Sequence, residues 1–198
     1  LMLAKLYKDL IGSGIDYARL DQQYREAFAR NIQNVVWVGK LDKRMLEFDL
    51  EALALHLQPM RDDLLRYLGV QRLYDQYFLK NADTREVLEA PQMFWMRVAM
   101  GLAMGEDEKT KRAQEFYEVL STLRYVPSSP TLYHAGMARA QLSSCFLSTV
   151  GDDLHEIFKS YGDSAHLLKW AGGMGMDWTP VRATGALVQS TGVESQGV

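Results

Sequence analysis

The chain contains a single cysteine, Cys145, which follows two serines in the segment LSSCFL. A thiol can act as a redox donor or a nucleophile, and the hydroxyls of Ser143 and Ser144 can donate hydrogen bonds to a ligand or to a thiolate. The alternative is a buried strand cysteine, because a lone thiol is most often a small buried hydrophobic side chain. A cysteine–histidine dyad is unsupported, since His134 and His155 are each about ten residues away.

A threonine and a glycine-rich segment offer contacts for a ligand. Thr131 follows Pro130 in a stretch rich in proline and serine, and its hydroxyl suits a phosphate oxygen, although it also suits a simple turn. Gly172, Gly173 and Gly175 allow close backbone approach to a flat or anionic ligand. This run follows a helical pattern instead of opening one, so it does not match the dinucleotide-binding fingerprint.

Asp152 and Arg182 form a candidate pair of ligand contacts. The aspartate is an acceptor, and the arginine is a fork-shaped donor that can hold a phosphate with two hydrogen bonds. As isolated residues, the two are more often a helix N-cap and a surface charge. No set of His, Cys, Asp and Glu has the spacing of a metal site, so no bound metal is predicted.

Residues 1–88 are predicted to form a helical region, because apolar residues recur there at helical spacing. Glycine and proline separate the helical runs, and a polar loop follows them. The predicted runs are 3–11, 21–32, 46–57 and 64–79, and the loop is 81–86.

Residues 89–198 are predicted to form the first part of an α/β domain. It would begin with a strongly apolar, buried helix, 89–105, which has Pro91 in its first turn. An amphipathic helix, an irregular or extended stretch and a strand would follow, over 107–123, 126–136 and 141–150.

The strand is followed by a predicted helix, 153–169, with Asp152 as its N-cap. Its inward residues would be Leu154, Ile157, Phe158, Tyr161, Ala165 and Leu168. A glycine-rich loop, AGGMGMDWTPVRATG, then runs into another strand-like stretch.

Composition narrows the class of protein. The 198 residues are 47% hydrophobic and 24% charged, with a net charge of −3 and no dense basic run, so binding of a nucleic-acid polymer is not predicted. No apolar stretch approaches the roughly 20 residues needed to cross a membrane, and the amphipathic start is not a signal peptide. One cysteine excludes an internal disulfide, which favours a cytoplasmic, reducing compartment. Both ends, Leu1 and Val198, are expected to be cut ends of a longer or split protein.

Several ordered blocks resemble the large subunit of ribonucleotide reductase, of the class I type. They are EAPQMFWMRVAMGLA, PSSPTLYHAG with QLSSCFL, GDDLHEIF, AGGMGMDWTPVRATG and STGVESQGV, and RDDLLRYLGVQRLYDQYFL also fits its helical region. The resemblance covers 60–198, and 1–59 more weakly. It implies a ten-stranded α/β barrel preceded by helices, of which this chain would supply the helices and the first part of the barrel.

The same resemblance implies the reduction of ribonucleoside diphosphates by thiol and radical chemistry. Cys145 matches the cysteine that gives an electron and a proton to the 2′-position of the ribose and then forms a disulfide with a distant second cysteine. Thr131, Ser144 and Gly173 match positions that contact the substrate.

The resemblance also implies an allosteric effector site and several partners. Asp152, Asp153, Leu154 and Arg182 match the site where a deoxynucleoside triphosphate or ATP sets substrate choice. The chain itself would bind no cofactor. The radical would come from a metal-containing small subunit, and thioredoxin or glutaredoxin would be the reductant. An α homodimer is expected, as is the rest of the large subunit, in the same chain or a separate one.

Two alternatives remain open from the sequence. One is a piece of the adenosylcobalamin-dependent class of reductase, which shares the barrel and the cysteine chemistry. The other is a non-catalytic, nucleotide-binding regulatory module in which Cys145 only packs. The family's radical-forming cysteine, disulfide partner and terminal cysteine pair would lie beyond Val198, and its ATP cone before Leu1.

Overall fold

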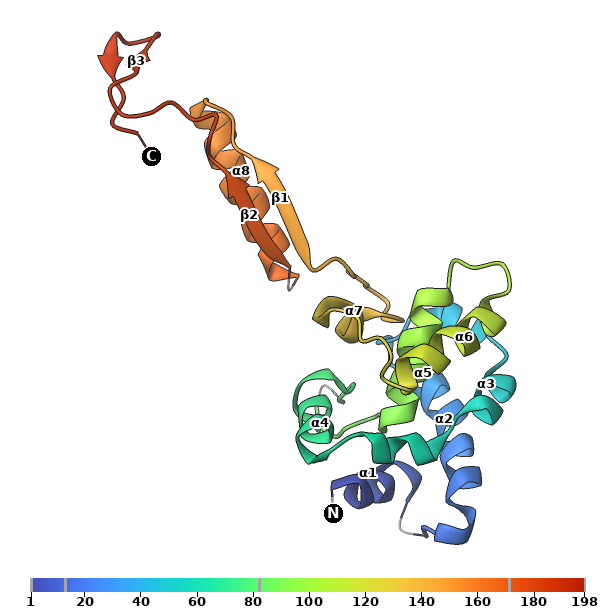
Figure 1. The fold of residues 1–198 in the computed structure, drawn as a ribbon. Coiled ribbons are helices and arrows are strands. Elements are labelled where there is room, and N and C mark those ends of the chain that lie inside the picture. Colours follow the sequence, from blue (N-terminus) through green and yellow to red (C-terminus); the bar gives the residue numbers. More distant parts are fainter. Residues whose placement is uncertain (1, 13, 82, 171, 198) are drawn as a thin grey trace. The chain divides into compact units, whose positions relative to one another are not determined.

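The structure, a computed structural model, describes residues 2–12, 14–81, 83–170 and 172–197. The chain divides into two units, Leu1–Leu142 and Ser143–Val198. The first unit is helical (Figure 1). Its α-helices are α1 (Met2–Ile11), α2 (Leu20–Trp37), α3 (Leu50–His56), α4 (Tyr67–Arg72), α5 (Pro91–Ala103), α6 (Lys109–Ser121) and α7 (Ser129–His134). Shorter helical turns are η1 (Tyr17–Arg19), η2 (Lys43–Glu47), η3 (Pro59–Leu64) and η4 (Leu73–Tyr77).

Helix α5 forms the centre of the first unit, as its apolar sequence predicts. Every residue of α5 except Leu102 is buried. Pro91 occupies the first turn, where its missing N–H costs no hydrogen bond. A Cβ atom on Gly101 would lie 2.2 Å from the backbone nitrogen of Gly136, so only glycine allows the chain after α7 to pack against this helix.

A buried polar network joins the helices around α5. The carboxylate of Asp62 accepts hydrogen bonds from Tyr7 Oη (2.6 Å), Gln92 Nε2 (2.9 Å) and Tyr24 Oη (3.4 Å). Tyr117 Oη donates to Gln92 Oε1 at 2.7 Å. These bonds satisfy polar groups in a site that excludes water, and they join α1, α2, η3, α5 and α6.

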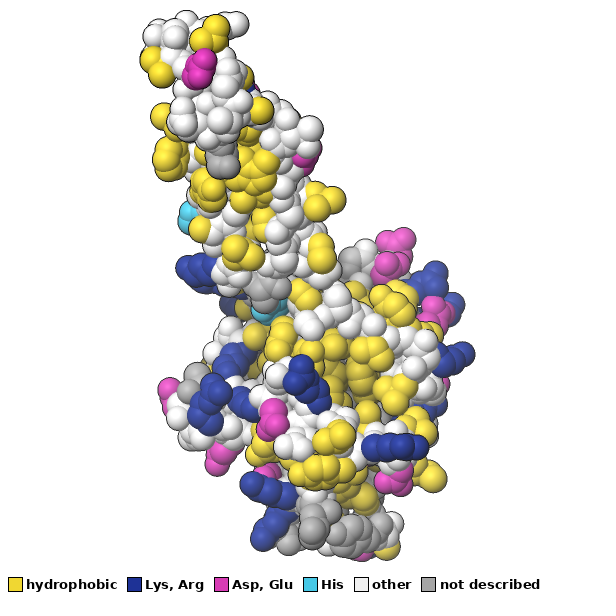
Figure 2. Space-filling view, turned by 60° about the vertical axis from the view of Figure 1, so that its left-hand side comes forward, with side chains coloured by type: hydrophobic (Ala, Val, Ile, Leu, Met, Phe, Trp, Pro, Cys, Tyr) yellow, Lys and Arg dark blue, Asp and Glu magenta, His cyan; other side chains and the backbone are white. Residues whose placement is uncertain are grey.

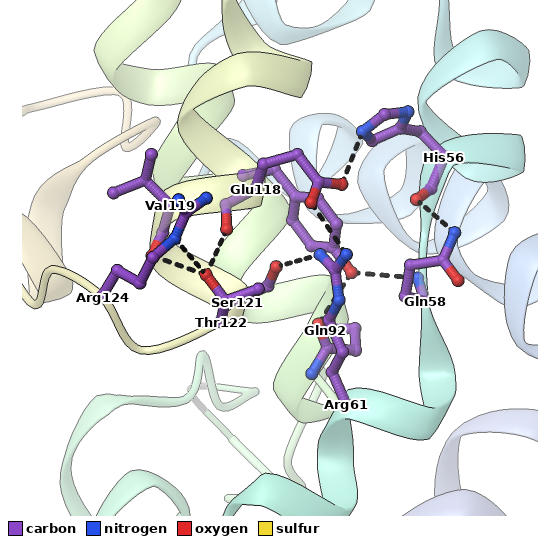
Figure 3. A network of polar contacts seen from close by, with 10 residues as sticks. His56, Gln58, Arg61, Gln92, Glu118, Val119, Ser121, Thr122 and Arg124 are labelled. Carbon is purple, nitrogen blue, oxygen red and sulfur yellow. Dashed lines mark hydrogen bonds and ion pairs between the residues drawn. The ribbon is translucent and has the colours of Figure 1, made fainter.

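A second polar cluster joins η3 to α3 and α6 (Figure 3). Arg61 lies at its centre, with Nη2 2.8 Å from Glu118 Oε2 and Nη1 2.6 Å from Ser121 Oγ. His56 Nε2 lies 3.0 Å from the other oxygen of Glu118. Burial raises the pKa of Glu118, but the hydrogen bond and charge of Arg61 and the contact with His56 outweigh it, so this pKa lies below its usual value.

The buried carboxyl group of Asp62 predicts a pH-dependent stability. Burial raises its pKa to about 6, even though the bonds from Tyr7, Gln92 and Tyr24 lower it. The folded state therefore binds this proton more tightly than the unfolded state does. The resulting stabilisation is fully present below about pH 4 and is lost as the pH rises through about 6.

Asp62→Asn should remove this titration. Between pH 4 and pH 6, the unfolding free energy of the wild type should fall relative to that of the variant, by at most about 1.4 kcal/mol per pH unit. Urea denaturation of both proteins across this range measures the difference. A difference that does not change with pH would contradict the prediction.

The stretch predicted to be irregular contains a helix, so that prediction was wrong. Helix α7 starts after Ser128, which has extended backbone angles, and has Pro130 in its first turn. Gly136 follows at φ +81°, a left-handed conformation that favours glycine after a helix. Six helical residues are too few to show a periodic apolar pattern, which is why the sequence did not reveal α7.

The second unit contains a strand–helix–strand crossover and a hairpin (Figure 1). Strand β1 (Cys145–Thr149) pairs in parallel with β2 (Gly173–Asp177), and α8 (Leu154–Lys169) connects them. Strands β3 (Leu187–Val188) and β4 (Val193–Glu194) pair antiparallel. The strand predicted at 141–150 is thus confirmed in shorter form, whereas part of the predicted glycine-rich loop is strand β2.

Two details of α8 differ from expectation. Its N-cap is Asp153, whose carboxylate accepts from the backbone N–H groups of His155 and Glu156, and not Asp152, which pairs with Arg182 instead.

The predicted inward face of α8 is also largely exposed, and Figure 2 shows hydrophobic side chains on the surface of the second unit. Exposed residues on it are Leu154, Phe158, Tyr161, Ala165 and Leu168. The less exposed stripe is Ile157, Ser160, Ser164 and Leu167, because the short strand pair covers a narrower strip of the helix than the predicted face. Ser164 contacts Met176 of β2 through its hydroxyl, 3.2 Å from the sulfur.

The division between the two units differs from the predicted boundary between residues 88 and 89. Helices α5, α6 and α7 belong to the first unit. The physical reason is the burial of α5 among the preceding helices, which makes it the core of the helical unit and not the start of the next one.

Candidate functional site

Three of the predicted substrate-contact residues lie together at the start of β1. Cys145, the first residue of the strand, is exposed and lies opposite Gly173 in the parallel register. The backbone N–H of Gly173 donates to the carbonyl of Ser144 at 2.7 Å. The pairing of β1 with β2 therefore brings the thiol, the serine and the glycine to one end of the strand pair.

The glycine preceding β2 is required by packing. A Cβ atom on Gly172 would lie 2.5 Å from the ring of Phe146, which is a forbidden contact. Gly173 is less constrained, since its added Cβ would find the carbonyl of Ser144 at an ordinary 3.6 Å. The absence of a side chain at Gly173 leaves the backbone beside Cys145 open to a ligand.

The fourth predicted substrate contact, Thr131, belongs to the first unit. It lies in α7, is 8% exposed, and donates its hydroxyl proton to the carbonyl of Leu142 at 3.2 Å. His134 Nδ1 lies 2.9 Å from the carbonyl of Gln141. Two side chains of α7 thus hold the backbone that leads into the segment of Cys145.

The four predicted effector residues line a single cavity of about 360 Å³ in the second unit. Asp152, Asp153 and Leu154 lie where β1 leads into α8, and Arg182 lies after β2. Arg182 Nε contacts both carboxylate oxygens of Asp152, at 3.0 and 2.9 Å, and its backbone N–H donates to the same side chain at 3.0 Å. Hydrogen bonds from Arg182 hold the pKa of Asp152 below its usual value.

Sequence reasoning missed part of this cavity. Its wall also contains Val188, Ser190, Ser195 and Gly197, from the β3–β4 hairpin and the residues beside it. The two serines add hydroxyl groups to a wall that also contains Arg182, two carboxylates and apolar side chains. These residues carry no motif of their own, and the only sequence signal of Ser190, Ser195 and Gly197 is their place in the block STGVESQG.

Within the residues that the structure describes, no group of three or more His, Cys, Asp and Glu side chains is arranged to hold a metal ion. None of the helices in the described ranges has the length and hydropathy to cross a bilayer.

Comparison with known families matches both units. The ribonucleotide reductase all-alpha domain matches residues 63–140, and the ribonucleotide reductase barrel domain matches residues 143–198. The chain belongs to the ribonucleotide reductase large-subunit family. The predicted family and fold class are thereby confirmed: a helical region precedes the start of an α/β barrel, of which β1, α8 and β2 are present.

Individual relatives agree with this assignment. The ribonucleoside-diphosphate reductase subunit alpha of Chlamydia muridarum is 49% identical over 198 residues, which is 100% of this chain and 19% of the relative. The protein of the same name from Helicobacter pylori (strain ATCC 700392 / 26695) is 41% identical over 157 residues, 79% of this chain and 20% of the relative. The large subunit from Acanthamoeba polyphaga mimivirus is 38% identical over 138 residues, 70% and 15% respectively. The chain spans about a fifth of the length of the curated relatives it matches.

Proposed function

We propose that this chain contributes one redox cysteine, part of the substrate site and part of the allosteric specificity site to a ribonucleoside-diphosphate reductase. The observation that carries the proposal is the position of Ser144, Cys145 and Gly173 at one end of the β1–β2 pair, in a chain that matches the barrel domain of that family. An exposed thiol beside an open glycine backbone can approach a ribose closely.

The thiol chemistry balances as a two-electron reduction. Two cysteine thiols become one disulfide and release two electrons and two protons. The ribose loses its 2′-hydroxyl as water and gains a hydrogen at that carbon. Cys145 would supply half of these equivalents, and a second cysteine outside this chain would supply the other half. The Thr131 hydroxyl donates its proton to the carbonyl of Leu142, so in this arrangement it can contact the substrate as a hydrogen-bond acceptor.

The cavity around Asp152 and Arg182 is proposed to bind a deoxynucleoside triphosphate or ATP as the specificity effector. The guanidinium group can hold a phosphate with two hydrogen bonds, and the carboxylate can accept from a sugar hydroxyl. Because the Asp152 carboxylate occupies Nε of Arg182 in the structure, a phosphate would bind through the Nη1 and Nη2 groups or displace the carboxylate.

The proposal includes partners outside this chain. They are the remaining part of the large subunit, a second copy of the large subunit, a metal-containing small subunit that supplies the radical, and thioredoxin or glutaredoxin as the reductant. A reducing cytoplasm would keep Cys145 available for turnover. The test is an assay of ribonucleoside diphosphate reduction by the assembled enzyme, and an inactive, correctly assembled enzyme would refute the proposal.

Arg182→Ala should weaken effector binding to the assembled large subunit by about 10- to 100-fold, because a charge-assisted, two-bond contact with phosphate is lost. Basal reduction should persist, while the effector's influence on substrate choice should fade. Titration calorimetry with a deoxynucleoside triphosphate measures the dissociation constant.

Lys159→Ala is the matched control, since Lys159 lies on α8 and pairs with Asp163 outside the cavity. Its effector affinity should equal that of the wild type. An unchanged affinity in Arg182→Ala would exclude Arg182 from the effector site.

A further inference from the structure

The core of the first unit contains a buried ion pair that the proposed chemistry does not use. Arg97 on α5 is 0% exposed and Glu89, just before α5, is 2% exposed. Arg97 Nε lies 2.5 Å from Glu89 Oε1, and Nη2 lies 3.3 Å from Glu89 Oε2. The second glutamate oxygen also accepts from the backbone N–H of Leu79 at 2.9 Å. Glu89 therefore accepts hydrogen bonds from both Arg97 and the backbone within the core.

The remaining donors of Arg97 point at the end of α7. Nη1 donates to the carbonyl of Ala135 at 2.7 Å, and Nη2 donates to the carbonyl of Leu132 at 3.2 Å. The last carbonyl groups of a helix have no partner within the helix, so a buried helix end needs donors from elsewhere. Arg97 supplies two such bonds from one rigid, planar group.

This arrangement fixes α7 more tightly than apolar packing alone would. Replacing a buried ion pair by apolar residues of similar size is often neutral or stabilising, so stability is a weak explanation for the pair. The ion pair instead fixes the orientation of the Arg97 side chain. A guanidinium group bonded to Glu89 can donate to the carbonyls of Leu132 and Ala135, at the end of α7, in only one orientation. The contact of Gly101 with the chain at Ala135 and Gly136 sets the distance between α5 and α7.

We infer that Arg97, held by Glu89, is a positioning residue that sets the placement of α7 and thereby of Thr131. The inference rests on the proposed function, in which Thr131 contacts the substrate. Arg97 acts through the backbone of α7, one residue beyond Thr131 at Leu132. Thr131 in turn holds the carbonyl of Leu142, three residues before Cys145.

Arg97→Lys in the assembled enzyme tests the inference. Lysine keeps the positive charge near Glu89, but its single ammonium group cannot reproduce the four hydrogen bonds of the fork. We expect the KM for the ribonucleoside diphosphate to rise at least about tenfold, with effector affinity within about twofold of the wild type.

Arg61→Lys is the matched control, because Arg61 also joins two helical elements through a glutamate and a second acceptor but does not contact α7 (Figure 3). It should lower the melting temperature while leaving KM unchanged. A folded Arg97→Lys enzyme with wild-type KM would overturn the inference. An equal rise in KM in both variants would also overturn it, since general destabilisation would then explain the effect.

Two further measurements keep the inference testable if Arg97→Lys does not fold or the enzyme is inactive. The double variant Glu89→Leu/Arg97→Met removes both charges and keeps the volume, and it should show the same rise in KM. Amide hydrogen exchange reports on the placement of α7 and requires no enzyme activity. Residues 131–135 should exchange faster in the Arg97 variants than in the wild type or in Arg61→Lys. Wild-type exchange rates there would refute the positioning role, whereas an inactive wild-type enzyme would refute only the proposed function.

Discussion

Replacing Cys145 by serine is expected to abolish turnover of the assembled enzyme with thiol reductants, by at least roughly 10³-fold. The physical reason is that a serine hydroxyl cannot be oxidised to a disulfide, so half of the reducing equivalents are missing. The substitution is nearly isosteric at an exposed strand position, so the fold should be retained. Reduction of a ribonucleoside diphosphate, followed by product chromatography, measures the loss.

The control is Thr149→Ser, at the other end of the same exposed face of β1. It should leave turnover unchanged. Effector binding at the cavity of Asp152 and Arg182 should survive in both variants, which separates a chemical defect from a misfolded second unit. Turnover of Cys145→Ser at the wild-type rate would remove Cys145 from the redox chemistry.

Gly101→Ala is expected to cost about 3 kcal/mol or more of unfolding free energy. The added Cβ would lie 2.2 Å from the nitrogen of Gly136 and 2.4 Å from the carbonyl carbon of Ala135. Both contacts are with backbone, which cannot rotate away as a side chain can. Relief requires α7 to move off α5, so the hydrogen bonds from Arg97 to Ala135 and Leu132 should weaken too.

Gly69→Ala in α4 provides the matched comparison. There the added Cβ would meet a side-chain atom of Leu65 at an ordinary 3.6 Å. Because alanine restricts the unfolded chain and favours a helix, Gly69→Ala should be neutral or stabilising by up to about 1 kcal/mol. Urea denaturation of both variants measures the contrast, and equal midpoints for Gly101→Ala and the wild type would contradict the packing argument.

Much of the fold could be predicted from local sequence patterns. The sequence predicts α5, with Pro91 at its start, and the short strand around Cys145. Both could be predicted because periodicity and helix-start signals are local. Helix α7 could not be predicted, because six residues carry too little pattern. Strand β2 was misread as a loop, since a Gly-Met-Gly-Met sequence becomes a strand only through its pairing with β1.

The candidate site was likewise only partly predictable from the sequence. Asp152 and Arg182 could be singled out by chemical type, and their direct pairing became visible only in three dimensions. Arg97 and Glu89 are eight residues apart and lie within or beside a run of apolar residues, so nothing local marks them as a pair that holds α7. Contacts between distant segments, such as Arg97 with Ala135, depend on packing that sequence spacing does not encode.

The short length of β1 has a consequence for communication within the second unit. The strand has five residues, roughly 16 Å of extended chain, with Cys145 at its first position and the acidic cavity wall beginning three residues after its last. Backbone hydrogen bonds to β2 keep the strand from slipping, since a shift of one residue would turn the thiol to the opposite face. The thiol and the proposed effector cavity therefore lie toward opposite ends of one strand. If the cavity binds the effector as proposed, β1 is the segment through which a movement at the cavity would reach the thiol.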